Sequence, residues 1–270
     1  MVLNTLLADQ LHFRTIWISD THLGTSGARA MELLHFLKHT RSETLYLVGD
    51  IIDGWQLKKR WYWPQPHNDV IQKILRKARH GTKVYYIPGN HDEAAREFTG
   101  LTFGEIEICE DAIHINPEGK RFWVVHGDLF DNVIQHARWL AYLGDTAYVL
   151  LLKINHWLNL FRRFFNLPYW SFSQYLKHKV KHAVSFISAF ETAMVKEARR
   201  RDCRGVICGH IHKPEIRQID DILYFNDGDW VESMTALVEH HDGRFEILNW
   251  SQMMQLSVAS GETLREMKET

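Results

Sequence analysis

Residues 13–24 read FRTIWISDTHLG, and this segment is the clearest indication of the fold. We predict that Phe13–Ser19 forms a buried strand, because a short, largely apolar run is typical of a strand covered on both faces. Asp20 and His22 follow this strand directly. In open α/β sheets, ligands bind just beyond the carboxyl ends of the strands. The stretch therefore predicts a central strand and a polar site at its end.

The same alternation continues along the first half of the chain. Stretches with apolar residues at helical spacing lie between further short apolar runs, and strand–helix–strand units of this kind indicate an α/β fold. The chain then ends in a strand-rich segment. The predicted strands are Leu45–Val48, Val84–Ile87, Phe122–Val125, Gly205–Cys208, Ile222–Phe225, Thr235–His240 and Phe245–Trp250, and the predicted helices are Ala28–His39 and Asn68–His80.

The composition excludes several classes of protein. Among 270 residues, 45% are hydrophobic and 24% charged, which is unlike a disordered or fibrous chain. The formal net charge of −1 argues against a dedicated nucleic-acid-binding protein, which is normally strongly basic. The three cysteines, at 109, 203 and 208, have no CxxC spacing, so we expect neither a disulfide framework nor a thiolate zinc site.

The chain shows no sign of a leader or a membrane span. Met1–Gln10 lacks a basic start followed by a long apolar core, so no signal peptide is visible. Ala147–Phe165 is the most apolar region, but polar and charged side chains interrupt it before a spanning length is reached. We therefore expect a cytosolic protein.

Residues 129–201 differ from the rest of the chain. They are crowded with aromatic side chains, carry eleven Lys and Arg against four acids, and contain no convincing strand. We predict a helical insertion here, between a core formed by residues 1–128 and 202–250, with residues 251–270 as a C-terminal tail. The alternative is a helical subdomain with its own core and a solvated basic face.

Five groups of polar residues follow the predicted strands. Taken singly, each group could be a turn or a helix cap. Five in order, each at a strand end, instead favour a common site, because the loops at one end of a sheet meet. The groups are Asp20 with His22, Asp50 with Asp53, Asn90-His91-Asp92, His126-Gly127-Asp128, and His210 with His212.

These side chains suit two neighbouring metal ions. One ion would be held by Asp20, His22, Asp50 and His212, and the other by Asp50, Asn90, His126 and His210, with Asp50 shared. Oxygen and imidazole ligands without thiolate suit Mn²⁺, Fe or Zn²⁺. Paired metals about 3.5–4 Å apart are typical of phosphatases and nucleases, so we predict hydrolysis of a phosphoester or a phosphoanhydride.

The ordered set DxH, GDxxD, GNHD, HGD and GHxH resembles the calcineurin-like metallophosphoesterase superfamily over roughly Thr15 to Asn226. The resemblance implies an α/β fold, a four-layer α/β-β/α sandwich. It also implies that the metal ligands are those given above and that His91 is a catalytic histidine that contacts the phosphate without binding metal. Asp92 would orient His91, and Asp53 would support the ligands or cap a helix. The alternative for His91 is a packing role.

The layout of the whole chain resembles the UDP-2,3-diacylglucosamine diphosphatase family of the lipid A pathway. SDTHLG at Ser19–Gly24, the HGD at His126–Asp128 and the long insertion carry this resemblance. It implies release of UMP and 2,3-diacylglucosamine 1-phosphate, two Mn²⁺ ions, an insertion that covers the acyl chains, and peripheral contact with the cytoplasmic face of the inner membrane. Expected substrate contacts are Asn90, Ser171, Ser173, Lys177 and Lys181.

One residue departs from that family. Its well-studied branch usually has arginine where this chain has His91 in GNHD, so the chain looks like a sister branch. The departure leaves metal-dependent hydrolysis intact and leaves the substrate open. Two alternatives remain: a soluble phosphoesterase that acts on a nucleotide or a phosphoprotein, and a binding scaffold without catalysis. The presence of every expected ligand disfavours the scaffold.

Overall fold

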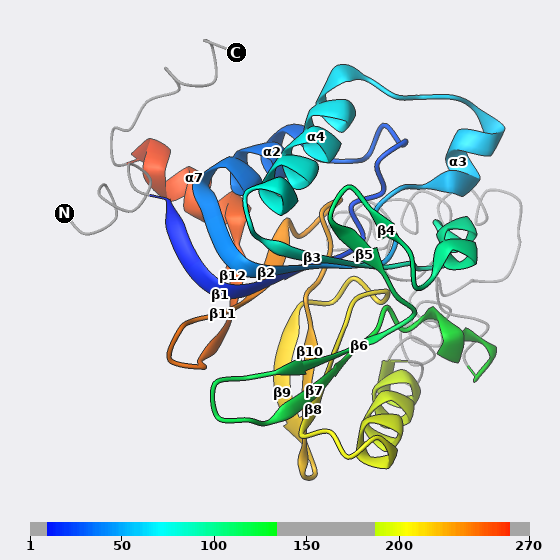
Figure 1. Ribbon diagram of the computed structural model, residues 1–270, viewed down its shortest axis with the longest axis vertical. Coiled ribbons are helices and arrows are strands. Elements are labelled where there is room, and N and C mark those ends of the chain that lie inside the picture. The colour runs from blue at the N-terminus through cyan, green and yellow to red at the C-terminus, as the bar shows by residue number, and fades with distance from the viewer. Residues whose placement is uncertain (1–9, 134–186, 260–270) are drawn as a thin grey trace, which may run out of the picture. The chain divides into compact units, whose positions relative to one another are not determined.

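The computed structural model describes residues 10–133 and 187–259, and two β-sheets with flanking helices make up this part of the chain. The larger sheet has the strand order β12-β11-β1-β2-β3-β5-β4, and the smaller has the order β6-β7-β8-β10-β9. The predicted α/β class with two sheets is confirmed. Figure 1 shows both sheets.

The larger sheet has a parallel centre. Strands β1 (Leu11–Ile18), β2 (Thr40–Val48), β3 (Lys83–Ile87) and β5 (Ile106–Ile108) run parallel. Antiparallel strands β11 (Thr235–Glu239), β12 (Phe245–Asn249) and β4 (Thr102–Phe103) complete its edges. Because β1, β2 and β3 are parallel, the loops that follow them leave the sheet at the same end.

The smaller sheet comes from the second half of the chain. Its strands are β6 (Ala112–Ile115), β7 (Arg121–Val124), β8 (Gly205–Cys208), β9 (Glu215–Ile219) and β10 (Ile222–Asn226). β7, β8 and β10 are parallel, whereas β6 and β9 pair antiparallel at the two edges. The loops that follow β7 and β8 carry the HGD and GHxH motifs.

Strand β1 is covered on both faces, as its apolar sequence predicts. Ile16 and Ile18 belong to the core formed with helices α2 (Ala30–His39) and α4 (Gln65–Arg79), which lie on the outer face of the larger sheet. Trp17 points to the opposite face and packs with Phe122 and Phe225 of the smaller sheet. Alternate side chains of one strand therefore hold a helix layer and a second sheet against it.

Several elements escaped the sequence analysis. The short strands β4, β5, β6 and β9, the helix α3 (Gly54–Lys59) and the 3₁₀ helices η1 (Glu93–Phe98) and η2 (Asp128–Val133) were not predicted. Helix α7 (Trp250–Ala259) begins at Trp250, which was predicted to end a strand, and continues into the predicted C-terminal tail of residues 251–270. Trp250 is buried and packs edge-on against Phe36 of α2, so a tertiary contact fixes this helix.

The chain divides into two compact units, Met1–Asp128 with Val195–Thr270 and Leu129–Met194. The second unit begins where the predicted insertion begins and ends at Met194 instead of Arg201. Of this unit, the structure describes only residues 129–133 and 187–194. In the described part of the chain, no helix has the length and apolar character needed to cross a membrane.

Candidate metal centre

The loops that follow β1 and β2 run side by side beyond the end of the sheet. The backbone amide of Asp20 donates to Gly49 O at 3.0 Å, and that of His22 donates to Asp50 O at 2.9 Å. These hydrogen bonds continue the parallel pairing of β1 with β2 past the last strand residue. The sheet therefore fixes the spacing between the DxH and GDxxD motifs.

Much of this site adopts an unusual backbone conformation. Of the nine described non-glycine residues with positive φ, five are predicted metal ligands. L-residues rarely adopt this left-handed region, and strained residues of this kind cluster at functional sites. The five are Asp20, His22, Asp50, His210 and His212.

Two motif glycines lie so close to the carboxylates of Asp50 and Asp20 that no side chain would fit there. A Cβ at Gly89 would lie 2.3 Å from Asp50 Oδ1, and one at Gly209 would lie 2.6 Å from Asp20 Oδ2. Real Cβ atoms do not come this close to other heavy atoms. The GNHD and GHxH loops therefore reach the carboxylates of β1 and β2 only because glycine begins each motif.

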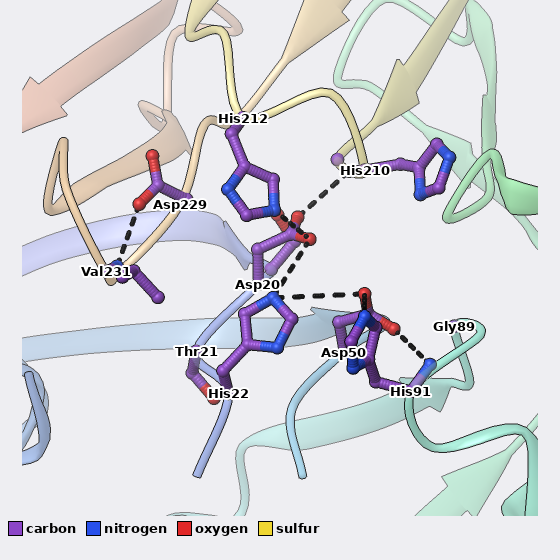
Figure 2. Close-up of polar contacts among 12 residues, drawn as sticks. Asp20, Thr21, His22, Asp50, Gly89, His91, His210, His212, Asp229 and Val231 are labelled. Atoms are coloured by element: carbon purple, nitrogen blue, oxygen red, sulfur yellow. Dashed lines mark hydrogen bonds and ion pairs between the residues drawn. The ribbon is translucent and has the colours of Figure 1, made fainter. Parts of the chain in front are cut away.

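Asp20, His22 and His212 form the first group of donors. Asp20 Oδ1 lies 3.0 Å from His212 Nε2 and 3.9 Å from His22 Nε2. One donor atom from each residue lies within 4.8 Å of the other two. Figure 2 shows both imidazole rings directed at the Asp20 carboxylate. The outer oxygen of that carboxylate, Oδ2, accepts a hydrogen bond from the His210 backbone amide at 2.9 Å.

Asp50, His126 and His210 form the second group. Asp50 Oδ2 lies 3.5 Å from His126 Nε2 and 3.9 Å from His22 Nε2, so it stands between the two groups. His126 Nδ1 donates to Val48 O at 2.8 Å. Because a carbonyl oxygen only accepts, this bond leaves Nε2 without a proton in the neutral ring and aims it at the site.

Charge compensation dominates the electrostatics of both groups. Burial alone would raise the pKa of Asp20, but the neighbouring charge of His212 and its hydrogen bond lower it below the usual range. Burial would likewise raise the pKa of Asp50, and the charge of His126 instead lowers it to about 2. Burial alone would lower the pKa of His212, but the negative charge of Asp20 raises it to about 9. The carboxylates are therefore ionised, as metal ligands must be.

The donor set fits divalent cations. Asn90 Oδ1 and His126 Nε2 are buried and have no hydrogen-bond partner among the described residues. Unpartnered buried polar atoms are costly and ask for an explanation, such as an ion. Oxygen and imidazole donors are the ligands that Mn²⁺, Fe and Zn²⁺ share. The residues present therefore fit the metal ions expected here.

His91 and Asp53 adjoin this centre. Asp53 Oδ2 lies 2.9 Å from His91 Nδ1 and 3.2 Å from His22 Nδ1, so one carboxylate serves two imidazoles. Its other oxygen accepts the Gln56 amide at 2.8 Å and caps helix α3. His91 Nε2 lies 3.9 Å from Asp50 Oδ2, and His91 therefore also forms a third potential donor group with His22 and Asp50.

Asp92 holds the backbone of two loops. Its carboxylate accepts hydrogen bonds from the backbone amides of Gly89 at 2.6 Å and Ile51 at 2.8 Å, and from the Tyr86 hydroxyl at 2.5 Å. These bonds tie the GNHD loop to the turn after β2. The sequence prediction gave Asp92 the task of orienting His91, whereas the structure gives the contact with His91 Nδ1 to Asp53.

Asp128, the last residue of HGD, ties two motifs together. Its two oxygens accept hydrogen bonds from Arg96 Nη2 at 2.8 and 2.7 Å. The same Nη2 donates to Pro88 O at 3.1 Å, just before the GNHD motif. Arg96, in η1, therefore links the loop after β3 to the loop after β7. Arg96 belongs to none of the motifs, so nothing in the sequence indicated this role.

The loop after β10 also supports the site, which the sequence analysis missed. Ser19 Oγ donates to Asp227 Oδ1 at 2.7 Å, directly beneath Asp20. Asp229 accepts the Val231 amide at 2.8 Å and shapes the turn beside His212. A signal was present, because Asp227-Gly228-Asp229 follows a strand in the same way as the other five groups.

The four predicted substrate contacts of the insertion lie outside the described residues. They are Ser171, Ser173, Lys177 and Lys181. Asn90, the remaining predicted contact, is buried in the loop after β3. The roles of all these residues, and of each predicted metal ligand, stay predictions.

Parallel strands that converge on clustered carboxylates and imidazoles define a class of protein, the metal-dependent hydrolases that act at the ends of a sheet. The family model for calcineurin-like phosphoesterases matches residues 13–214. The chain belongs to this family and is a metal-dependent phosphoester hydrolase. The predicted family and enzyme class are confirmed.

Curated relatives cover most of the chain. A UDP-2,3-diacylglucosamine hydrolase of Aeromonas hydrophila is 26% identical over 254 residues, which cover 83% of this chain and 93% of the relative. The protein of the same name from Hamiltonella defensa is 26% identical, with 77% and 81% covered. That from Yersinia pseudotuberculosis is 24% identical, with 76% and 85% covered.

Proposed function

We propose that this phosphoester hydrolase uses two divalent cations, one held by Asp20, His22, Asp50 and His212, the other by Asp50, Asn90, His126 and His210. The observation that carries the proposal is the position of Asp50 Oδ2, which lies 3.9 Å from His22 of one donor group and 3.5 Å from His126 of the other. Mn²⁺ is the favoured ion, and Fe and Zn²⁺ suit the same ligands.

The chain's own residues divide the remaining work. Bound divalent cations supply positive charge that polarises a phosphoryl group and lowers the pKa of a water molecule. His91 extends beyond the ligands and contacts the phosphate. Asp53 holds the rings of His91 and His22 at their Nδ1 atoms, which fixes both orientations. Val48 O fixes the ring of His126 in the same manner.

The substrate proposed is UDP-2,3-diacylglucosamine. Water cleaves its diphosphate, and the products are UMP and 2,3-diacylglucosamine 1-phosphate. Three relatives that carry the name UDP-2,3-diacylglucosamine hydrolase support this, since each matches over three quarters or more of this chain. Asn90, Ser171, Ser173, Lys177 and Lys181 would contact the substrate, and the aromatic insertion would cover the acyl chains.

A surface segment beside the site, formed by the end of α3 and the residues that follow it, supports peripheral contact with a membrane. Residues 58–63 read KKRWYW, and Trp61 and Tyr62 are 74% and 40% exposed. Trp and Tyr next to Lys and Arg are typical of segments that lie at a lipid–water interface. The segment begins within α3, and the centroid of the Trp55 ring in the same helix lies 4.4 Å from that of the His91 ring. We therefore place the enzyme at the cytoplasmic face of the inner membrane.

A second candidate is a soluble phosphoesterase for a nucleotide or a phosphoprotein. The observation that favours it is His91, which stands where the diacylglucosamine enzymes usually carry arginine. A neutral or singly charged imidazole makes fewer hydrogen bonds to a phosphate than a guanidinium fork does. This candidate predicts turnover of simple aryl phosphates without preference for acylated compounds.

Product analysis separates the two candidates. Purified protein with Mn²⁺ is incubated with UDP-2,3-diacylglucosamine in detergent, with UDP-N-acetylglucosamine and with an aryl phosphate. Release of UMP from the diacylated substrate alone supports the lipid pathway, and Asp50→Asn should abolish it. Equal turnover of the aryl phosphate would overturn the lipid assignment and leave the phosphoesterase class intact.

The membrane contact has its own test. Trp61→Ser with Tyr62→Ser should weaken co-sedimentation with anionic vesicles, whereas Ile115→Ser, which alters a 51% exposed residue of the smaller sheet, should not. Equal binding by both variants would remove this segment from the proposed membrane surface.

A further inference from the structure

A cavity of about 780 Å³ opens at the amino ends of β1, β2 and β3, opposite the metal centre. Its walls come from the start of β1, the start of β2, the last turns of α4 and the turn after β11. Because β1 spans eight residues at about 3.3 Å each, this cavity lies roughly 25 Å from the metal centre. Its volume is within the range of small-molecule sites.

The cavity is strongly basic although the chain as a whole is nearly neutral. Arg41, Lys73, Arg76 and Lys77 line it, against a single acid, Glu43. Glu43 Oε1 lies 3.4 Å from Nδ1 of His241, which lines the same cavity. Within residues 10–133 and 187–259, none of the four cations has a carboxylate at ion-pair distance. A concave surface with charge of one sign attracts ligands of the opposite sign.

Lys77 shows that the cavity is built around an interior charge. Its side chain is only 9% exposed, and in the described structure its Nζ has one acceptor, Thr40 O at 2.5 Å. An ammonium carries three N–H donors. Burial lowers the pKa of Lys77 to about 8, and the nearby charges of Lys73 and Arg41 act in the same direction. An anion in the cavity would reverse this repulsion and supply the missing acceptors.

We propose that this basic cavity binds a phosphate-bearing anion at a second site, distinct from the metal centre. Guanidinium and ammonium groups on converging walls are the donors that bind phosphate oxygens. The phosphate could belong to a free phosphate compound or to a lipid headgroup, and both share this chemistry. The proposal is independent of the reaction at the metal centre, since no residue is common to the two sites.

Helix α4 offers a matched pair of arginines for the test. Arg76 and Arg79 both lie in its last turn, where cations favour the negative end of the helix dipole. Both are exposed, but only Arg76 lines the cavity. If the arginines only stabilise the helix, replacing either one should have the same effect. If the cavity binds a ligand, only the replacement of Arg76 should weaken binding.

The probe is inorganic pyrophosphate, added to the metal-loaded protein at low ionic strength. Hydrogen exchange should slow in peptides that cover residues 40–43 and 73–82. This protection should persist in Asp50→Asn, in which the metal centre is impaired. By calorimetry, Arg76→Gln or Lys73→Gln should weaken binding at this site about tenfold, the effect of one lost charge-assisted hydrogen bond. Arg79→Gln should leave the affinity unchanged.

A second arm tests the lipid source. Vesicles of phosphatidylglycerol should retain the protein, vesicles of phosphatidylcholine should not, and Arg76→Gln but not Arg79→Gln should reduce retention if a headgroup is the ligand. A response to either probe that depends on Arg76 supports the site and identifies the source. If neither probe distinguishes Arg76→Gln from Arg79→Gln, the cations serve the end of the helix and the proposal is overturned.

Discussion

The two ends of the parallel strands β1, β2 and β3 make opposite use of charge. At the carboxyl ends, carboxylates and imidazoles crowd together in strained turns and compensate one another within a few ångströms. At the amino ends, cations line an open cavity with a single acid among them. The first arrangement holds cations and the second attracts anions. One sheet can therefore carry two unlike sites, because its ends share strands but no side chains.

The largest effect should come from removing a ligand at the carboxyl ends. His126→Ala deletes a buried imidazole that neighbours Asp50, and hydrolysis should fall by about 1,000-fold or more, since the charge that stabilises the reacting phosphoryl group is lost. Bound metal, measured by elemental analysis, should fall with it. Full metal content in an inactive variant would mean that His126 is not a ligand.

His91→Ala should have the next largest effect and should leave the metals in place. Loss of a positioned acid or base costs about 100-fold to 10,000-fold in turnover. Steady-state kinetics together with elemental analysis distinguish this outcome from ligand loss. If the variant loses metal, the third donor group of His22, Asp50 and His91 is the true ligand set.

Asp53→Asn should cost less, about 10-fold to 100-fold, the usual effect of altering a residue that orients a ligand. Asparagine still caps α3, so the fold is retained while the charge beside His91 and His22 is removed. Asp92→Asn is the comparison, because its carboxylate holds the loop backbone. We expect Asp92→Asn to lower the melting temperature. A larger fall in melting temperature in Asp53→Asn than in Asp92→Asn would mean that Asp53, and not Asp92, mainly stabilises the fold.

The loss in Asp53→Asn should also depend on His91. In the His91→Ala background, Asp53→Asn should reduce turnover by much less than it does alone, because both changes act on one imidazole. Independent, multiplying effects would show that Asp53 acts mainly through His22.

The smallest effect lies at the amino ends and concerns stability. The pKa of Lys77 is about 8 in the folded protein against an ordinary 10.5, so the unfolded chain holds more protons between these values. This lysine therefore makes the protein more stable as pH rises through that window. The free energy of unfolding, measured with urea, should therefore rise less between about pH 8 and 10.5 in Lys77→Met than in the unaltered protein. Lys83→Met, which alters an exposed lysine, should show the full rise. Identical slopes in both variants would mean that the cavity does not hold an interior charge.

The sequence predicted the strands that carry the site. The predicted Gly205–Cys208 is strand β8 as observed, and the predictions for β1, β2 and β3 end within a residue of the observed strands. The carboxyl-terminal halves of β1 and β2 and all of β8 are buried, so their sequences are largely apolar and easily recognised. Of the strands missed, β4, β6 and β9 lie at sheet edges, and β5, between β3 and β4, has only three residues, so none of them leaves such an apolar run.

Side-chain partners were harder to predict than motif positions. Asp92 adjoins His91 in the GNHD motif, whereas Asp53 belongs to the GDxxD motif, and only the observed distances assign the contact with His91 Nδ1 to Asp53. The left-handed turns at Asp20 and Asp50 leave no mark in the sequence, because aspartate is common in ordinary turns as well. The residues of the basic cavity are scattered from Arg41 to His241, and a net charge of −1 conceals them.

By itself, the sequence determined which residues stand at the ends of buried strands, since apolar periodicity and motif spacing are properties of neighbours along the chain. Which of these residues meet depends on the three-dimensional fold. Parallel pairing brings Asp20 beside Gly49, Asp53 beside His91, and the cations of β2 and α4 around one cavity. Contacts between residues far apart in the chain depend on the register of strands and the packing of helices, and neither is written in any local pattern.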